Sequence, residues 1–180
     1  MAKSAVILSL FAFSVASSLW AHTCVASVSI RLAGPEISAI CDKSVDRQFC
    51  LNFLQSTPGI STADLKGAGL IVLDSARAEA SSTESYVKAL LGKATDPKQK
   101  EVYKTCLSNY DDAVDDIEAA KASMSGGDYN GANIQASGAQ ENADTCDEGV
   151  KGSDLSKKNQ HLFKVLDIVL LLPTSCAVDD

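Results

Sequence analysis

The feature that most constrains this chain is a stripe of residues with helical spacing between Tyr103 and Met124. Its members follow one another at alternating intervals of three and four, which places them on one face of an α-helix. They are Tyr103, Cys106, Tyr110, Ala113, Ile117, Ala120 and Met124. After Ser125-Gly126-Gly127 the same alternation returns in Tyr129, Ala132, Ala136, Ala139, Ala143, Cys146 and Val150. The pattern predicts two amphipathic helices joined by a glycine turn.

Two further segments have a helical period. The first begins at Ser61-Thr62-Ala63-Asp64, which has the form of a capping box, and runs to about Lys93. Its apolar side consists of Leu65, Ala68, Val72, Ala76, Thr83, Val87 and Leu90. The second runs from about Asn159 to Leu172 and is stopped by Pro173. Four amphipathic segments joined by short breaks predict an all-α fold, an up-down-up-down four-helix bundle.

Two cysteines on the stripes allow an internal check. Residues that face each other in an antiparallel helical hairpin have numbers with a constant sum, and the midpoint of Cys106 and Cys146 is Gly126, inside the predicted turn. The second stripe is mostly alanine, so the helices can approach within the roughly 7 Å between Cα atoms that a disulfide demands. We predict a Cys106–Cys146 bond. Cys41 and Cys50, with eight residues between them, fit a bond across a small N-terminal helical hairpin.

The first residues have the order of a secretory signal. Lys3 is followed by an apolar run and then by small residues, with cleavage plausible after Ala26 or, as a second option, after Ala16. We therefore expect residues 1–26 to be a signal peptide and residues 27–180 to form one domain, with the hairpin in 27–58 and the bundle in 59–180. An exported chain enters an oxidising compartment, which favours the two disulfides and leaves Cys176 without a partner.

The formal net charge is −7, and it becomes −8 without residues 1–26 because Lys3 is their only charged residue. An acidic chain disfavours nucleic acid as a partner and favours a basic protein surface. After signal removal no membrane-associated segment is expected.

The chain has no evident constellation for chemistry. His161 is the only histidine after residue 26, and the cysteines lack CxxC spacing, so no Cys/His metal site is expected. A calcium loop beginning at Asp128 fails because Ala132 and Asn133 occupy positions that need a ligand and a glycine. We predict no catalytic residue, no metal and no cofactor.

One helix carries a dense acidic cluster, made of Asp111, Asp112, Asp115, Asp116 and Glu118. Like charges one turn apart on a helix repel each other, at a cost of a few tenths of a kcal/mol per pair. The cluster is either a solvated face or a surface for a cationic partner.

Several motifs resemble those of the plant invertase and pectin methylesterase inhibitors. The matching elements are Ile40-Cys41 with Cys50, Asp64-Leu65-Lys66-Gly67, Ala94-Thr95-Asp96-Pro97, Cys106 with Tyr110 and Ala113, Gly127-Asp128-Tyr129-Asn130, and Asp144-Thr145-Cys146. The resemblance implies a four-helix bundle behind a small helical hairpin, with the two disulfides paired as above. It also implies a secreted protein of the cell wall or apoplast that is not an enzyme but blocks one in a one-to-one complex.

The resemblance favours pectin methylesterase as the target. Invertase inhibitors of this family commonly carry Pro-Lys-Phe after the glycine-containing turn, and here that stretch is Asp128-Tyr129-Asn130. In the pectin methylesterase branch, the outer surfaces of the middle helices clamp across the pectin-binding cleft of a more basic enzyme. The positions that match this surface are Asp112, Asp115, Asp128, Asn133, Thr145 and Glu148.

Two alternatives remain open at this stage. The protein could inhibit an acid invertase by a route other than Pro-Lys-Phe. It could also be a helical binding module without an enzyme target, like family members known chiefly as allergens. Asp128 could simply cap its helix, and Thr145 could be only a surface neighbour of the disulfide.

Overall fold

The computed structural model describes residues 32–172. The signal peptide predicted for residues 1–26, and Cys176, lie outside the described residues. The helices are α1 (Gly34–Cys41), α2 (Arg47–Ser56), the short 3-10 helix η1 (Ile60–Thr62), α3 (Leu65–Lys93), α4 (Pro97–Gly126), α5 (Tyr129–Val150) and α6 (Asp154–Leu171). The described part of the chain contains no strand.

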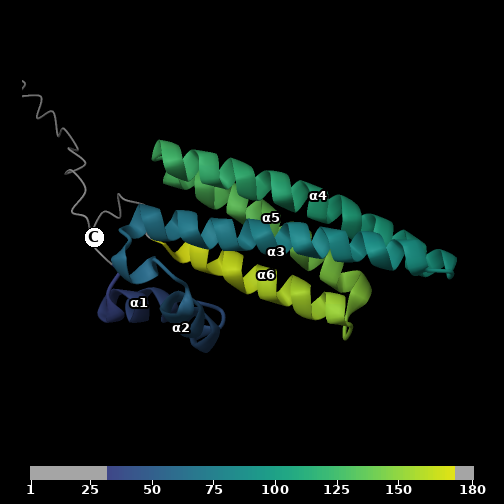
Figure 1. The fold of residues 1–180 in the computed structure, drawn as a ribbon, viewed down its shortest axis with the longest axis horizontal. Coiled ribbons are helices and arrows are strands. Elements are labelled where there is room, and N and C mark those ends of the chain that lie inside the picture. The colour runs from purple at the N-terminus through teal and green to yellow at the C-terminus, as the bar shows by residue number, and fades with distance from the viewer. Residues whose placement is uncertain (1–31, 173–180) are drawn as a thin grey trace, which may run out of the picture.

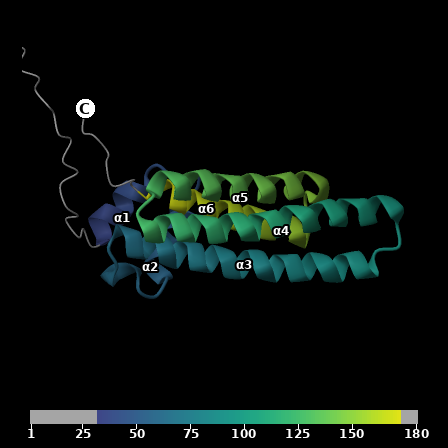
Figure 2. The ribbon, with the colours of Figure 1, turned by 90° about the horizontal axis from the view of Figure 1, so that it is seen from above.

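Helices α3 to α6 form the predicted four-helix bundle, in which α4 packs between α3 and α5, and α6 between α5 and α3. The hairpin of α1 and α2 lies at one end of the bundle, beside α6 (Figure 1). At the opposite end α3 and α4 extend beyond α5 and α6 (Figure 2). Their lengths explain this, because α3 and α4 have 29 and 30 residues whereas α5 and α6 have 22 and 18. The all-α bundle with its hairpin is confirmed.

Side-chain caps fix where the bundle helices begin. Asp96 accepts a hydrogen bond from Gln99 N at 2.9 Å, which leaves Pro97 in the first turn of α4 as expected. The capping box at Ser61 is wrong, because Asp64 caps α3 by accepting from Gly67 N at 2.7 Å. Helix α6 begins five residues before the predicted Asn159. The hydroxyl of Ser153 caps it, and burial of Leu155 extends its apolar stripe.

The core consists of the predicted stripes. All seven members of the α5 stripe except Tyr129 are buried, and four of them are alanines, so α4 and α5 approach closely. Both predicted disulfides are present, with Cα atoms 4.7 Å apart in Cys106–Cys146 and 5.5 Å apart in Cys41–Cys50. Beside the first bond, the hydroxyl of Tyr110 hydrogen-bonds the amide of Asn159 at 2.8 Å. Burial raises the pKa of Tyr110, so its hydroxyl stays protonated.

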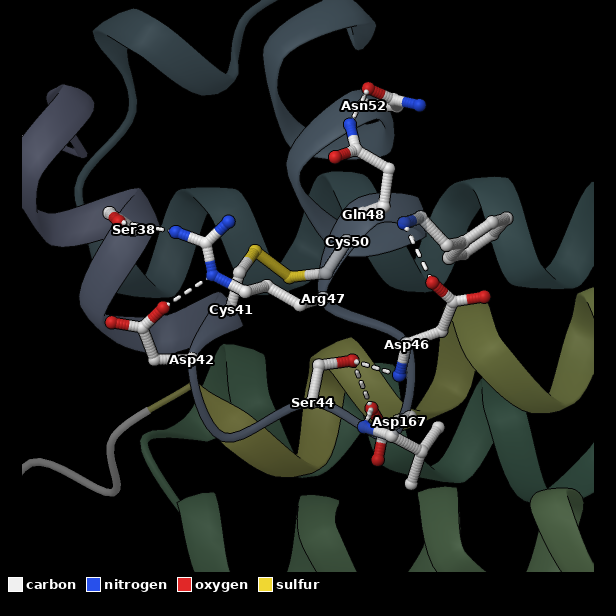
Figure 3. The surroundings of a disulfide bond; sticks show 12 residues. Ser38, Cys41, Asp42, Ser44, Asp46, Arg47, Gln48, Cys50, Asn52 and Asp167 are labelled. Carbon is white, nitrogen blue, oxygen red and sulfur yellow. Dashed lines mark hydrogen bonds and ion pairs between the residues drawn. A yellow bond between two sulfur atoms is a disulfide. The ribbon is translucent and has the colours of Figure 1, made fainter.

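The hairpin is closed by Cys41–Cys50 and by polar contacts around it (Figure 3). Asp46 caps α2 by accepting from Phe49 N at 3.1 Å. Arg47 Nε lies 2.6 Å from Asp42 Oδ1, and its guanidinium also donates to Ser38 Oγ at 3.2 Å. These contacts link the end of α1 to the start of α2 and so fix the two ends of the loop between them.

Two carboxylates attach this loop to α6. Asp167, only 8% exposed, accepts from Ser44 Oγ at 2.7 Å and from Val45 N at 3.2 Å (Figure 3). Asp46 pairs with Lys164 of α6 at 2.9 Å. The hydrogen bond from Lys164, together with that from Phe49 N, holds the pKa of Asp46 below its ordinary value. The hairpin is thus docked by ionic and polar contacts as well as by apolar packing.

Asp167→Ala tests the docking. We expect the variant to lose about 1–3 kcal/mol of unfolding free energy, because Ser44 and Val45 lose a partly buried acceptor. Chemical denaturation measures the loss, and limited proteolysis of the loop at residues 42–46 reports local opening. Asp42→Ala, which removes an exposed partner of Arg47, is the control and should change stability little. Equal stability of the two variants would contradict the role of Asp167 in docking the hairpin loop.

The disulfides differ in the loops that they close, with sequence separations of 40 for Cys106–Cys146 and 9 for Cys41–Cys50. Cys106→Ala/Cys146→Ala should therefore destabilise the fold by about 2–4 kcal/mol, mainly because the unfolded chain gains freedom. Cys41→Ala/Cys50→Ala should cost about 1 kcal/mol less, since the loop is shorter. Denaturant unfolding of both variants measures the two losses of stability. A larger loss in Cys41→Ala/Cys50→Ala than in Cys106→Ala/Cys146→Ala would refute this account.

Candidate functional site

The four aspartates of α4 point in three directions. Asp111 borders a hollow that Glu84 and Lys88 of α3 also line. Asp116 turns toward α5 and accepts from Asn142 Nδ2 at 3.2 Å. Asp112 and Asp115 lie between them, exposed, with no hydrogen bond or salt bridge to another described residue. Asp111 is also exposed and unpaired among the described residues, so Asp112 and Asp115 differ from it in lying away from α3.

The acidic row is partly neutralised from α3. Glu118 pairs with Arg77 of α3, whose Nε lies 2.6 Å from Glu118 Oε1. A second bridge between the two helices has the opposite polarity, since Lys121 of α4 pairs with Asp74 of α3. The sequence of α4 alone does not reveal the first partner, because Arg77 lies 41 residues away along the chain. Glu118 is therefore a bridge between α3 and α4.

The pKa of Asp116 is raised above its ordinary value. The main cause is partial burial, and the neighbouring charges of Asp112 and Asp115 raise the pKa further. The hydrogen bond from Asn142 lowers the pKa but does not cancel these effects. Gly138 of α5 leaves room for the Asp116 side chain, since a Cβ at residue 138 would lie 2.9 Å from Asp116 Oδ2. The carboxylate thus lies directly against the α5 backbone.

The predicted residues of α5 are spread along the helix. Asp128 is exposed and caps α5 by accepting from Gly131 N at 2.9 Å. Thr145 is exposed beside the Cys106–Cys146 bond and, with Gly149, borders a hollow of about 170 Å³. Asn133 and Glu148 stand about 22 Å apart along the axis. The set follows the bundle surface rather than converging on a pocket.

Helical spacing defines one outer face of α5. Ile134, Glu141, Thr145 and Glu148 follow one another at intervals of seven, four and three, and all four are exposed. Ile134, with 65% exposure, is one of two large hydrophobic side chains that project from the described structure. Asn133 lies about 100° round the helix from this face and is half-buried. Sequence reasoning missed Ile134 and Glu141, although their spacing from Thr145 identifies them.

We define the acidic face as Asp112 and Asp115 of α4 together with Ile134, Glu141, Thr145 and Glu148 of α5. It combines four carboxylates with one apolar side chain. Such a surface can bind a basic protein by charge complementarity around an apolar contact. Within residues 32–172 no three histidine, cysteine, aspartate or glutamate side chains are grouped as metal ligands would be. Across the same residues no helix is long and apolar enough to span a bilayer.

Comparisons with known proteins agree with this architecture. The profile of the family described as plant invertase/pectin methylesterase inhibitor matches residues 35–172. The chain is 38% identical to a pectinesterase inhibitor of Actinidia deliciosa over 149 residues, covering 80% of each protein. It is 34% identical to pectinesterase inhibitor 2 of Arabidopsis thaliana, covering 87% of this chain and 91% of that protein. The crystal structure of a mutant form of an Arabidopsis pectin methylesterase inhibitor superposes with a TM-score of 0.71 at 28% identity, covering 76% of this chain and 94% of that one.

A disulfide-bonded four-helix bundle with a docked hairpin and an acidic outer face defines the structural class of this protein. The chain belongs to the plant invertase/pectin methylesterase inhibitor family. The family resemblance drawn from the motifs is confirmed.

Asp116→Asn should stabilise the fold at neutral pH by about 0.5 kcal/mol, because it removes a partly buried charge and its repulsion from two neighbouring carboxylates. The sign follows from the raised pKa. The ionised folded state is disfavoured above that pKa, and the penalty disappears as pH falls through it toward the ordinary value of 3.8. Urea unfolding of both proteins at neutral and at acidic pH measures the difference in their unfolding free energies, which should vanish in acid. A difference that grows in acid would contradict the raised pKa of Asp116.

Proposed function

We propose that this protein inhibits a plant pectin methylesterase by forming a one-to-one complex that covers the pectin-binding cleft of the enzyme. The inhibitor itself carries out no reaction, and its effect is to preserve methyl esters on the polymer. The observation that carries the proposal is the pair Asp112 and Asp115, exposed and unpaired within the described residues of a family member.

The acidic face supplies the chemistry of recognition. Two unpaired carboxylates on α4 and two on α5 favour approach to a basic surface, which raises the association rate and selects the partner. Ile134 offers an apolar contact that a complementary hollow can bury. Asp128 and Asn133 lie toward the hairpin end of this surface and are proposed as flanking contacts.

Secretion is part of the same proposal. Residues 1–26 act as a signal peptide, residues 27–58 contain the hairpin, and residues 59–180 contain the bundle of the inhibitor domain. The mature protein acts in the apoplast or cell wall, where its disulfides persist. Neither nucleic acid nor a membrane takes part.

Invertase inhibition is the main competing function, because the family includes both kinds of inhibitor. The turn after Gly127 argues against it. At the position where invertase inhibitors of the family commonly carry Pro-Lys-Phe, this chain has Asp128, and α5 begins at the next residue. A cationic side chain that could enter an acidic active site is missing from this turn. A third reading, a binding module without an enzyme target, requires that neither enzyme be inhibited.

Titration of the mature protein against a plant pectin methylesterase, following acid release from methylated pectin, tests the proposal. We expect activity to fall stoichiometrically while an acid invertase assayed in parallel is unaffected. Loss of invertase activity alone would establish the competing function. Full activity of both enzymes would leave only the binding-module reading.

Asp112→Asn/Asp115→Asn should weaken inhibition about 2- to 30-fold, since two exposed ion pairs are lost. Steady-state titration gives the inhibition constant, and the loss should shrink as salt screens the contacts. The matched control is Asp111→Asn/Glu118→Gln, which removes two charges from the side of α4 that faces α3. Equal effects of the two double variants would remove Asp112 and Asp115 from the interface.

A further inference from the structure

The end of the bundle opposite the hairpin is basic, although the protein as a whole is acidic. Residues 88–104 and 151–158, which we call the basic tip, contain half of the chain's 16 lysines and arginines and only three acids. The rest of the described chain has six basic residues against 18 acidic ones. The tip comprises the end of α3, the start of α4, the turn between α5 and α6, and the first residues of α6 (Figures 1 and 2).

A hollow of about 350 Å³ lies at the tip between α4 and the α5–α6 turn. Lys98 and Lys151 border it, from two segments that are far apart in sequence. Its other polar and aromatic lining consists of Gln99, Tyr103 and Ser153. The hollow therefore combines two cationic groups with an aromatic ring, an amide and a hydroxyl.

The lysines of the tip are available to a ligand. Lys93, Lys98, Lys100 and Lys151 are exposed and make no salt bridge to another described residue. Lys104 and Lys157 pair only with acids one turn away on their own helices, at 3.6 and 2.8 Å. Exposed pairs of this kind contribute little, so they exchange readily for a ligand carboxylate.

The basic tip has no role in the complex proposed above, because a basic enzyme would repel it. Charge complementarity instead calls for a polyanion. A tyrosine ring with a neighbouring amide and hydroxyl suits a sugar, since a ring face packs on C–H groups and the polar groups bond hydroxyls. Both requirements are met by a polyuronate, a polysaccharide with one carboxylate on each sugar.

We propose that the basic tip binds de-esterified pectin, with Lys98 and Lys151 pairing with uronate carboxylates and Tyr103 packing against a sugar ring. The choice of polymer rests on the proposed function, because removal of methyl esters produces this polyanion. The acidic face runs along α4 and α5 and meets the basic tip only at Glu148, one turn before Lys151, so one molecule can hold the enzyme and its product polymer side by side. Binding at the tip concentrates the inhibitor where de-esterification has occurred.

The test is direct binding of the mature protein to immobilised polygalacturonate, without any enzyme, at low salt and with EDTA present. We expect saturable binding that is lost at about 0.5 M NaCl, since screening removes exposed ion pairs. Fully methyl-esterified pectin should not bind. Lys98→Gln/Lys151→Gln should weaken binding about three- to tenfold.

The matched control is Lys43→Gln/Lys121→Gln, which removes the same charge outside the tip and should leave binding nearly unchanged. Thermal unfolding verifies that both variants are folded. Absence of binding by the unmodified protein, or equal weakening by both variants, would overturn the proposal. Binding that requires Ca²⁺ would also overturn it, because the ion would then bridge the polymer to the acidic residues. Esterase inhibition plays no part in this readout, so the two proposals can fail separately.

Discussion

The close packing of α4 against α5 is the constraint on which the rest of the structure depends. It requires the small side chains of Ala132, Ala136, Ala139 and Ala143, because larger ones would separate the helix backbones. The Cys106–Cys146 bond fixes this pair at one point, and the capped glycine turn at Gly127 fixes it at the end. With α4 and α5 held in register, their outer sides become one continuous surface.

Several polar side chains join separate parts of the fold. Tyr110 and Asn159 join α4 to α6 within the core, while Asp167 and Lys164 of α6 hold the loop of the hairpin. Each polar group in these pairs is satisfied by a partner from another helix or from the hairpin loop, which makes the arrangement specific. Helix α6 is consequently the element that both completes the bundle and positions the hairpin.

Charge is distributed unevenly over this rigid scaffold. Carboxylates gather along the middle of the bundle, with Asp112 and Asp115 unpaired among the described residues, and lysines gather where α3 and α4 extend past their neighbours. Net charge alone describes such a protein poorly, because surfaces of opposite charge can attract different partners. The opposite charge of the acidic face and the basic tip, which adjoin between Glu148 and Lys151, is the physical basis for assigning them different ligands.

Sequence alone predicted the bundle helices and the two disulfides, because periodicity, turn residues and cysteine spacing are local or symmetric signals. The family was predicted from the resemblance of the motifs. Sequence reasoning placed the start of α6 too late: the cap by Ser153 is a local signal that was overlooked, whereas the burial of Leu155 depends on neighbouring helices. Only the tertiary structure divided the aspartates of α4, pairing Asp116 with Asn142 and leaving Asp112 exposed. The tertiary structure also brought Lys98 and Lys151, which are 53 positions apart in the chain, to the border of one hollow. Such contacts form between segments remote in sequence, and no local pattern encodes them.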